Sequence, residues 1–150
     1  MWTLFVCFLF VVSESKFEYK YSIKAPILDE NNNLPFFEHF GNSMLDNTKI
    51  RLVPSIQNQK GLVQSRYKTN FEWWEVLIDF HIFGQSRIGA DGMAFWFTDA
   101  KGVTGPTFGR SENWYGLGLV LDSYDNDHQR NNPIITGYLN NATYVYDHSR

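Results

Sequence analysis

The chain has 150 residues, of which 43% are hydrophobic and 17% aromatic, and its formal net charge at pH 7 is −3. Its basic residues are scattered singly along the sequence, so it lacks the concentrated positive charge that a nucleic-acid-binding protein presents. This composition excludes nucleic acid as a partner and supplies enough apolar material for one hydrophobic core.

The N-terminal segment, residues 1–12, is the apolar block MWTLFVCFLFVV. It is too short for the roughly 20 residues that a membrane-spanning helix needs, and small residues at Ser13 and Ser15 supply a cleavage site. We expect residues 1–15 to be a signal peptide; the alternative is a buried N-terminal strand. Cys7 is the only cysteine, so the mature chain is expected to form no disulfide. The expected product, residues 16–150, enters the lumen of the secretory pathway and contains no later stretch long enough to cross a membrane.

Strand-like alternation is visible in chain order from residue 16. Residues 16–23 (KFEYKYSI) and residues 71–83 (FEWWEVLIDFHIF) place apolar side chains at every second position, which predicts half-exposed strands. Residues 92–97 (GMAFWF) and 115–121 (YGLGLVL) are apolar on both faces, as in central strands of a sandwich. A further strand is expected over residues 142–148 (ATYVYDH), after a turn at residues 139–141.

Clusters of Gly, Asn, Asp and Pro separate these runs, and no stretch has three turns of helical amphipathicity. We therefore expect one all-β domain of two packed antiparallel sheets, without internal repeats. Such a fold does not by itself specify a function.

An acidic loop follows the apolar run at 115–121. In the sequence LDSYDNDHQRNN, residues 121–132, the carboxylates Asp122, Asp125 and Asp127 are interleaved with side-chain amides. Carboxylates packed this closely repel one another, and oxygen ligands without Cys or paired His favour a hard cation such as Ca²⁺. The simpler interpretation is a solvated turn in which Asn and Asp cap their own backbone, and both interpretations stay open at this point. An EF-hand is excluded, because a loop starting at Asp125 would place Arg130 at its glycine position and Thr136 at its glutamate position.

Two further features carry polar groups. Asp91 lies in a glycine-flanked turn, GADG, before the run at 92–97, where glycine permits a sharp bend or a close approach of backbone to a ligand. The sequence YDH places Asp147 and His148 on opposite faces of the expected last strand. Each feature alone is more typical of an ordinary turn or a structural histidine.

Taken together, these segments resemble the carbohydrate-recognition domain of the animal L-type (leguminous-type) lectins, most nearly its mannose-binding cargo receptors of the ER–Golgi intermediate compartment. The matching segments run from residue 17 to the last residue in the family's order and spacing: FEYKYS, LPFFEHFGN, IRLVPS, GLVQSRYK, RIGADGMAFWF, GPTFG, LDSYDNDHQRNNP and YDH. The resemblance implies a concanavalin A-like β-sandwich (jelly roll) without enzymatic activity. It also implies binding of high-mannose N-glycans on glycoproteins, with Ca²⁺ as the cofactor.

The resemblance also implies roles for individual residues. Asp122, Asn126 and the main-chain carbonyl of Tyr124 match the calcium ligands, while Asp125, Asn131 and Asn132 lie where some members hold a second calcium ion. Asp91, Asn126 and His148 match residues that hydrogen-bond mannose. An asparagine whose carbonyl oxygen binds Ca²⁺ presents its NH₂ group to the sugar, so the ion would orient the amide. A cis peptide bond between Ala90 and Asp91 is also implied.

Three features qualify the resemblance. Asn58 occupies the position at which mannose-binding members usually carry a serine that contacts the sugar, so its contribution is open. The sequence stops at Arg150, before the last calcium-binding aspartate and the glycine-rich loop of the family, and before the stalk and membrane span of its type I membrane proteins. We therefore expect residues 16–150 to be the N-terminal part of the lectin domain. Asn141-Ala142-Thr143 is a sequon for N-glycosylation on an expected loop.

Two alternatives to the calcium-dependent cargo receptor stay open. A paralogue or truncated isoform that binds protein partners without sugar is favoured by Asn58 and by the missing C-terminal part. A glycoside hydrolase on the same fold would need two carboxylates about 5–9.5 Å apart across the scissile bond, and Asp91 with Asp122 is the one pair the sequence offers. Protein co-receptors and homo-oligomers are expected only through regions absent from this sequence.

Overall fold

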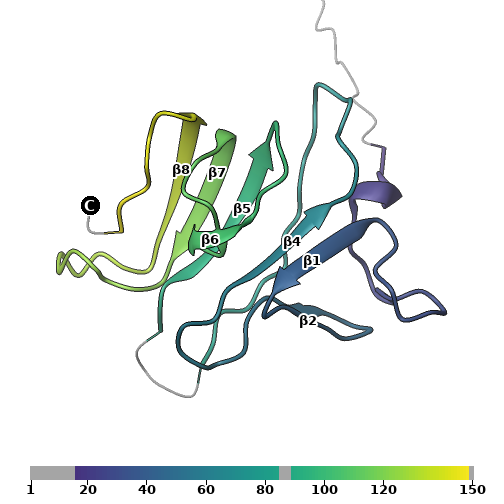
Figure 1. Ribbon diagram of the computed structural model, residues 1–150, viewed down its shortest axis with the longest axis horizontal. Helices are drawn as coiled ribbons and strands as arrows, with labels where there is room; N and C mark the ends of the chain where they lie inside the picture. Colours follow the sequence, from purple (N-terminus) through teal and green to yellow (C-terminus); the bar gives the residue numbers. More distant parts are fainter. Residues whose placement is uncertain (1–15, 85–88, 149–150) are drawn as a thin grey trace, which may run out of the picture.

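The computed structural model describes residues 16–84 and 89–148, and in them the fold is almost entirely β (Figure 1). The expected signal peptide, residues 1–15, lies outside the described residues. One short 3-10 helix, η1 (Tyr19–Tyr21), precedes the strands. The strands are β1 (Phe37–Gly41), β2 (Met44–Leu45), β3 (Ile50–Arg51), β4 (Gly61–Ser65), β5 (Gly92–Thr98), β6 (Thr104–Thr107), β7 (Tyr115–Asp122) and β8 (Ile134–Asn141).

Seven of the eight strands in the described chain form three antiparallel sheets, while β6 makes only isolated bridges to Arg110. The largest has the order β5-β7-β8, with Asp122 of β7 opposite both Gly92 of β5 and Ile134 of β8. The other two are the pairs β1-β4 and β2-β3. In Figure 1 the three-stranded sheet and the β1-β4 pair lie beside each other, and β6 is drawn across the strands of the three-stranded sheet. The expected all-β class is confirmed, and the large sheet is the part that positions the acidic loop.

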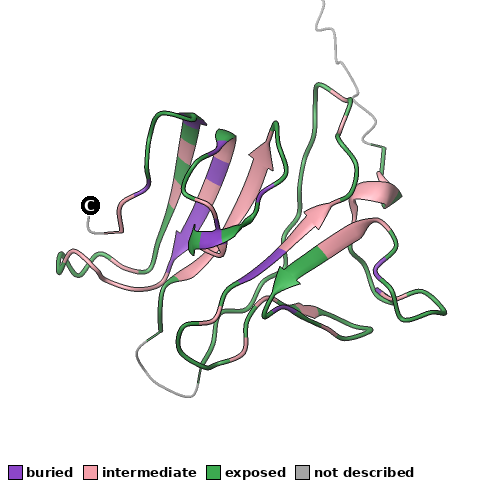
Figure 2. Cartoon of the chain, in the orientation of Figure 1, coloured by how far each residue is buried: buried purple, intermediate pink, exposed green. Residues whose placement is uncertain are grey.

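The core lies on one face of the β5-β7-β8 sheet. Trp114 and Val120 are almost fully buried there, together with Tyr146, and Trp96 and Phe108 pack around them (Figure 2). The rings of Trp96 and Trp114 meet edge to face with centroids 5.0 Å apart, a favourable geometry for aromatic pairs. Gly118 leaves room for this cluster, because a Cβ there would lie 2.6 Å from the indole ring of Trp96.

The predicted strands at 92–97 and 115–121 are confirmed as β5 and β7. The continuous apolar character of β7 follows from packing on both faces of the sheet. Val120 lies in the core cluster on one face, and on the other face Trp74 packs on Phe95 of β5, the partner of Leu119.

The strand predicted at residues 16–23 is wrong. The chain turns there, with the backbone N–H of Tyr21 donating to the carbonyl of Glu18 and that of Ser22 to the carbonyl of Tyr19. Its aromatic side chains pack on other loops instead of a sheet: the rings of Tyr21 and Phe71 lie 5.5 Å apart. The aromatic residues at every second position of residues 16–23 therefore make individual contacts with other loops and do not form one face of a strand.

The strand predicted at residues 71–83 is also not formed, although its alternation survives in the exposures. Trp74 packs on β5, with its ring 4.6 Å from that of Phe97, whereas the neighbouring Trp73 is 89% exposed and Leu77 is 91% exposed. No strand of the described chain pairs with this segment, so it lacks the hydrogen-bond ladder that defines a strand.

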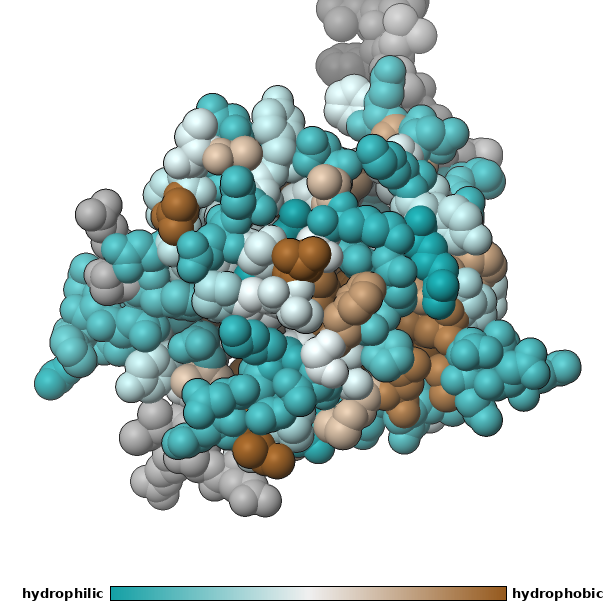
Figure 3. All heavy atoms as spheres, in the orientation of Figure 1, coloured by the Kyte–Doolittle hydropathy of each residue, from teal (hydrophilic) through white to brown (hydrophobic). Residues whose placement is uncertain are grey.

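The face of the molecule shown in Figure 3 is mostly hydrophilic, and its hydrophobic residues lie in separate patches.

The strand predicted at residues 142–148 is replaced by an irregular segment. Ala142 has a φ of 67°, which an extended strand does not allow. The side chain of Asn140 then takes the place of a neighbouring strand: Nδ2 donates to the carbonyl of Tyr144 at 2.8 Å, and Oδ1 accepts from the N–H of Tyr144 at 3.1 Å. The segment returns along the sheet and brings Tyr146 into the core.

Candidate functional site

The acidic loop connects β7 to β8 at one end of the large sheet. It starts where Asp122 closes β7 and ends at a cis peptide bond between Asn132 and Pro133, just before β8. Because β5 runs antiparallel to β7, the turn that carries Asp91 arrives at the same end of the sheet. Pairing of the strands therefore brings together two motifs that lie about 30 residues apart in the sequence.

Asp122 is buried and its carboxylate is held in place. Oδ1 accepts a hydrogen bond from the backbone N–H of Tyr124 at 3.0 Å, and Oδ2 accepts one from the hydroxyl of Tyr146 at 3.4 Å. Burial, and then the charge of Asp122, raise the pKa of Tyr146, which favours its neutral, donating form. Each carboxylate oxygen has about two acceptor positions, so capacity for a cation remains.

Two oxygens of the loop are enclosed without a donor. Oδ1 of Asp125 and Oδ1 of Asn126 are buried, and neither accepts a hydrogen bond within the described part of the chain. The second oxygen of Asp125 accepts from the backbone N–H of Arg130 at 3.1 Å, so the loop holds its own shape. A buried polar atom that lacks a partner costs about 1–3 kcal/mol, and a cation bound to both oxygens would remove that cost.

These donors fit a calcium ion. Ca²⁺ binds carboxylates, side-chain amides and main-chain carbonyls, which are the groups that Asp122, Asn126 and Tyr124 contribute to this loop. The described residues contain no group of three or more His, Cys, Asp or Glu side chains that would form a metal site alone. A metal ion bound at this loop would therefore need amide and main-chain oxygens among its ligands.

Asp91 is fixed beside the acidic loop through its backbone. Its carbonyl accepts hydrogen bonds from the N–H of Ser123 at 2.9 Å and from the hydroxyl of Ser123 at 3.3 Å, and its side chain is exposed. The expected cis peptide bond between Ala90 and Asp91 is present. A Cβ on Gly92 would collide with the carbonyl of Leu121, so glycine permits this approach.

His148 reaches the site through aromatic contacts. Its ring lies 4.9 Å, centroid to centroid, from Tyr146 and the same distance from Phe108. Nδ1 of His148 is buried without a hydrogen-bond partner among the described residues. Because the hydroxyl of Tyr146 also donates a hydrogen bond to Asp122, the segment that carries His148 is joined to the end of β7 from which the acidic loop starts.

Sequence reasoning did not identify Ser123, Phe108 or Tyr146 as contributors. Ser123 is inside the acidic motif, and only the pairing of β5 with β7 shows that it holds Asp91. Tyr146 has a signal in the sequence, because alternation places it on the same face as His148. Phe108 lies in the matched segment GPTFG, but this segment is far from both motifs in the sequence and gives no sign of a contact with His148.

The remaining candidates lie at the edge of the site or away from it. Asn132 donates from Nδ2 to the carbonyl of Asp122 at 3.4 Å, and Asn131 is exposed. Asn58 is exposed in the loop between β3 and β4 and has a φ of 61°, a conformation that asparagine adopts more readily than serine. The backbone therefore gives a reason for asparagine at position 58 that does not involve sugar.

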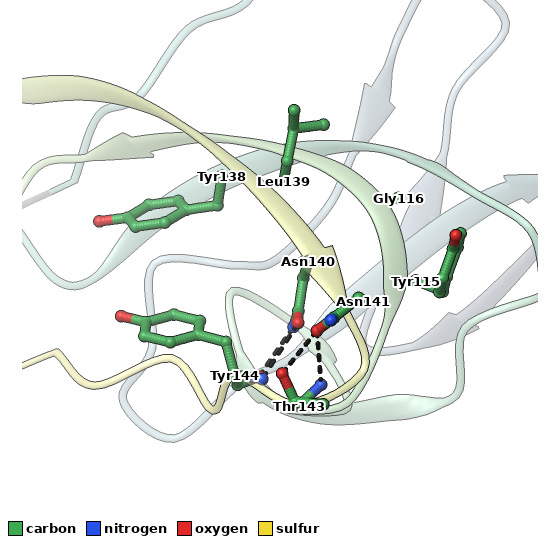
Figure 4. Close-up of a pocket in the computed structure, with 8 residues that line it drawn as sticks. All are labelled: Tyr115, Gly116, Tyr138, Leu139, Asn140, Asn141, Thr143 and Tyr144. Atoms are coloured by element: carbon green, nitrogen blue, oxygen red, sulfur yellow. Dashed lines mark hydrogen bonds between the residues drawn. The ribbon is translucent and has the colours of Figure 1, made fainter.

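A hollow of about 720 Å³ lies at the opposite end of β7, where Tyr115, Tyr138, Leu139 and Tyr144 are among its lining residues (Figure 4). Tyr115 begins β7 and Asp122 ends it, so this hollow is separate from the acidic loop.

In residues 16–84 and 89–148, no helix is long and apolar enough to span a bilayer.

Comparison with known protein families shows to which family the chain belongs. The legume-like lectin family matches residues 14–150. The chain belongs to this family. The family is one of lectins and not of enzymes, so the chain is not an enzyme and the glycosidase alternative is set aside.

Curated relatives agree with this assignment. Mouse protein ERGIC-53 is 44% identical over 134 residues, which cover 89% of this chain and 26% of that protein. Human ERGIC-53 is 43% identical over the same coverage, and human vesicular integral-membrane protein VIP36 is 32% identical over 80% of this chain and 35% of its own length. The chain therefore spans about a quarter of the ERGIC-53 proteins that it matches.

Solved structures confirm the fold. The exoplasmic/lumenal domain of VIP36 bound to Ca²⁺ and Man3GlcNAc superposes with a TM-score of 0.79 at 29% identity, covering 88% of this chain and 54% of that one. The form bound to Ca²⁺ and mannose gives a TM-score of 0.77 at 28% identity, covering 89% of this chain and 57% of that one. The predicted concanavalin A-like β-sandwich is thus confirmed.

Proposed function

We propose that the protein is a calcium-dependent mannose-binding lectin and serves as a cargo receptor for glycoproteins moving from the ER to the Golgi. The observation that carries the proposal is the enclosed Oδ1 of Asn126, which has no donor within the described residues. An amide oxygen in that position suits a hard cation, and the VIP36 domain, a structural neighbour, binds Ca²⁺.

Calcium supplies a fixed positive charge that holds oxygen ligands in one geometry. Asp122, Asn126 and the main-chain carbonyl of Tyr124 are the proposed ligands, with Asp125 beside them. The hydrogen bonds from Tyr124 and Tyr146 to Asp122 hold that carboxylate before the ion arrives. Preformed ligands lower the cost of ordering the site on binding.

The sugar-binding groups follow from the same arrangement. Each mannose hydroxyl is both a donor and an acceptor, so a specific site needs fixed groups of both kinds. The carboxylate of Asp91 accepts, the NH₂ of Asn126 donates once its oxygen is held, and His148 can do either. Ser123 fixes Asp91 through its backbone and thereby limits where the acceptor can lie.

The proposed partners are high-mannose N-glycans of glycoproteins in the lumen of the ER, the ER–Golgi intermediate compartment or the Golgi. The VIP36 structures support this class of ligand, because they contain mannose, Man2 or Man3GlcNAc in a domain described as exoplasmic/lumenal. Oligomerisation and a protein co-receptor stay predictions.

The test is retention of the full chain on immobilised mannose. We expect retention in Ca²⁺ and release by a chelator. Asn126→Ala should abolish retention, whereas Asn31→Ala, an exposed asparagine in a distant loop, should leave it unchanged. Retention that persists in chelator, or in Asn126→Ala, would contradict the proposal.

A second candidate is a family member that binds proteins without binding sugar, and Asn58 favours it. If Asn58 obstructs the pocket, Asn58→Ser should create retention on mannose where the natural chain shows none. Loss of retention in Asn58→Ser would instead assign Asn58 a direct contact with the sugar. Folding of the variant is checked by circular dichroism, since serine is less favourable than asparagine at a φ of 61°.

A further inference from the structure

The sequon Asn141-Ala142-Thr143 is not used by the proposed lectin site. It is the only Asn-X-Ser/Thr sequence, with X other than proline, in the 150 residues. Asn141 is the last residue of β8, and all three residues of the sequon are exposed. The motif thus lies on the surface at the end of an ordered strand.

The turn holds the acceptor side chain in a defined way. Oδ1 of Asn141 accepts hydrogen bonds from the hydroxyl of Thr143 at 2.5 Å and from its N–H at 3.3 Å (Figure 4). The N–H of Ala142 donates to the carbonyl of Trp114 at 2.9 Å, which anchors the turn to the start of β7. Both side-chain hydrogen bonds of Asn141 use its oxygen, and within the described residues Nδ2 carries none.

The surroundings can accommodate a bulky substituent. Asn141 helps to line the hollow of about 720 Å³ at this end of the sheet. Tyr115, directly opposite Asn141 on β7, is 57% exposed, and Leu139, two residues earlier on the same face of β8, is 86% exposed. The apolar faces of sugar rings could cover these two side chains.

The position is also remote from the calcium and mannose residues. Asn141 pairs with Tyr115, whereas Asp122 at the other end of β7 pairs with Ile134. Asp122 follows Tyr115 by seven positions, and at about 3.3 Å per residue the two ends lie about 23 Å apart. A substituent on Asn141 therefore leaves the acidic loop accessible.

We propose that Asn141 carries an N-linked oligosaccharide. The proposal rests on the lumenal location within the proposed function, because the co-reactant is an oligosaccharide linked to a lipid diphosphate in that compartment. Nδ2 forms a bond to the anomeric carbon of the first sugar and loses a proton, while the bond from that carbon to the diphosphate oxygen breaks and the lipid diphosphate leaves. The hydroxyl of Thr143, bonded to the amide oxygen, orients the acceptor.

The experiment is expression of the full chain in a eukaryotic secretory host. The natural chain should migrate more slowly on a gel than Asn141→Gln, and peptide-N-glycosidase should remove the difference and convert Asn141 to Asp, as read by mass spectrometry. Thr143→Ser should keep the modification and Thr143→Val should lose it. Retention on mannose should be the same for the natural chain and Asn141→Gln, given the separation of about 23 Å.

A second sequon separates the two ways in which the proposal can fail. In the Asn141→Gln background, Glu72→Thr places a threonine two positions after Asn70 and so completes a new sequon there, and both Asn70 and Glu72 are exposed. Modification at Asn70 with an unmodified Asn141 in the natural chain would show that the chain enters the lumen and would overturn the glycosylation site. If neither the natural chain nor the variant with the new sequon is modified, both the glycosylation site and the lumenal location are overturned. Mannose binding is tested independently, by retention of the purified protein on immobilised mannose.

Discussion

The hydroxyl of Tyr146 donates a hydrogen bond to Oδ2 of Asp122 across 24 residues of sequence, at a distance of 3.4 Å. This contact joins the returning segment at 142–148 to the end of β7 where the proposed calcium ligands lie. Tyr146 also packs its ring against Tyr138 and His148, so one side chain belongs to both the core and the site. Stability of the sheet and geometry of the site are therefore coupled through Tyr146.

Tyr146→Phe tests this coupling by removing the hydroxyl and keeping the ring. We expect the free energy of unfolding to fall by about 0.5–1.5 kcal/mol, because buried Asp122 loses a donor. The measurement is urea unfolding followed by fluorescence in the presence of chelator. Tyr144→Phe is the matched control, since its side chain is exposed, and it should be nearly neutral. Equal stability of Tyr146→Phe and the natural chain would contradict the coupling.

The sequence predicted β5 and β7 correctly because continuous apolar runs indicate packing on both faces, which the core cluster and Trp74 provide. It failed at residues 16–23, 71–83 and 142–148, where alternation indicated strands. Alternation reports which side chains face inward, but a strand also requires a hydrogen-bonded neighbour, and that neighbour is set by tertiary structure. At residues 142–148 the side chain of Asn140 replaces the neighbour. β8 was missed because Gly137 and two asparagines resemble turn residues.

In the candidate site, too, some features could be predicted from the sequence and others depend on tertiary structure. For Asp122 and Asn126 the sequence predicts a hard cation, because clustered carboxylates and amides favour one, and this stays a prediction. The residues that hold the site in place could not be predicted. The hydrogen bond from Ser123 to Asp91 and the contact of Phe108 with His148 depend on strand pairing and loop packing. Residue types thus lead to a hypothesis about the ligand class, whereas the fold determines which neighbours hold those residues in place.

Gly61→Ala should be strongly destabilising. A Cβ at Gly61 would collide with the carbonyl of Leu52, which is backbone and cannot move aside as a flexible side chain could. We expect a loss of about 1–3 kcal/mol from the resulting backbone shifts, measured by urea unfolding. Gly137→Ala is the control, because a Cβ there would have no atom within 4 Å, and it should be neutral or slightly stabilising. Similar behaviour of the two variants would contradict the packing of Gly61.

Trp114→Ala tests where the core lies. Trp114 is 2% exposed and packs edge to face on Trp96, so its removal leaves a large cavity in the cluster around Val120. We expect a loss of about 3–5 kcal/mol in the free energy of unfolding. Trp73→Ala removes an equally large side chain that is 89% exposed, and it should change stability by at most about 0.5 kcal/mol. A larger effect for Trp73→Ala would place the core on the other face of the sheet.

Asn126→Asp separates the calcium-binding oxygen from the sugar-binding NH₂ group. Aspartate keeps an oxygen ligand for Ca²⁺ and loses the NH₂ donor, so we expect calcium binding to be retained and mannose affinity to fall about tenfold or more. Calorimetry with Ca²⁺ and then with mannose measures the two separately, and Asn126→Ala should lose both. Gln129→Glu adds the same charge at an exposed position in the same loop, and its mannose affinity should stay near that of the natural chain. Unchanged mannose affinity in Asn126→Asp would show that the NH₂ group does not contact the sugar.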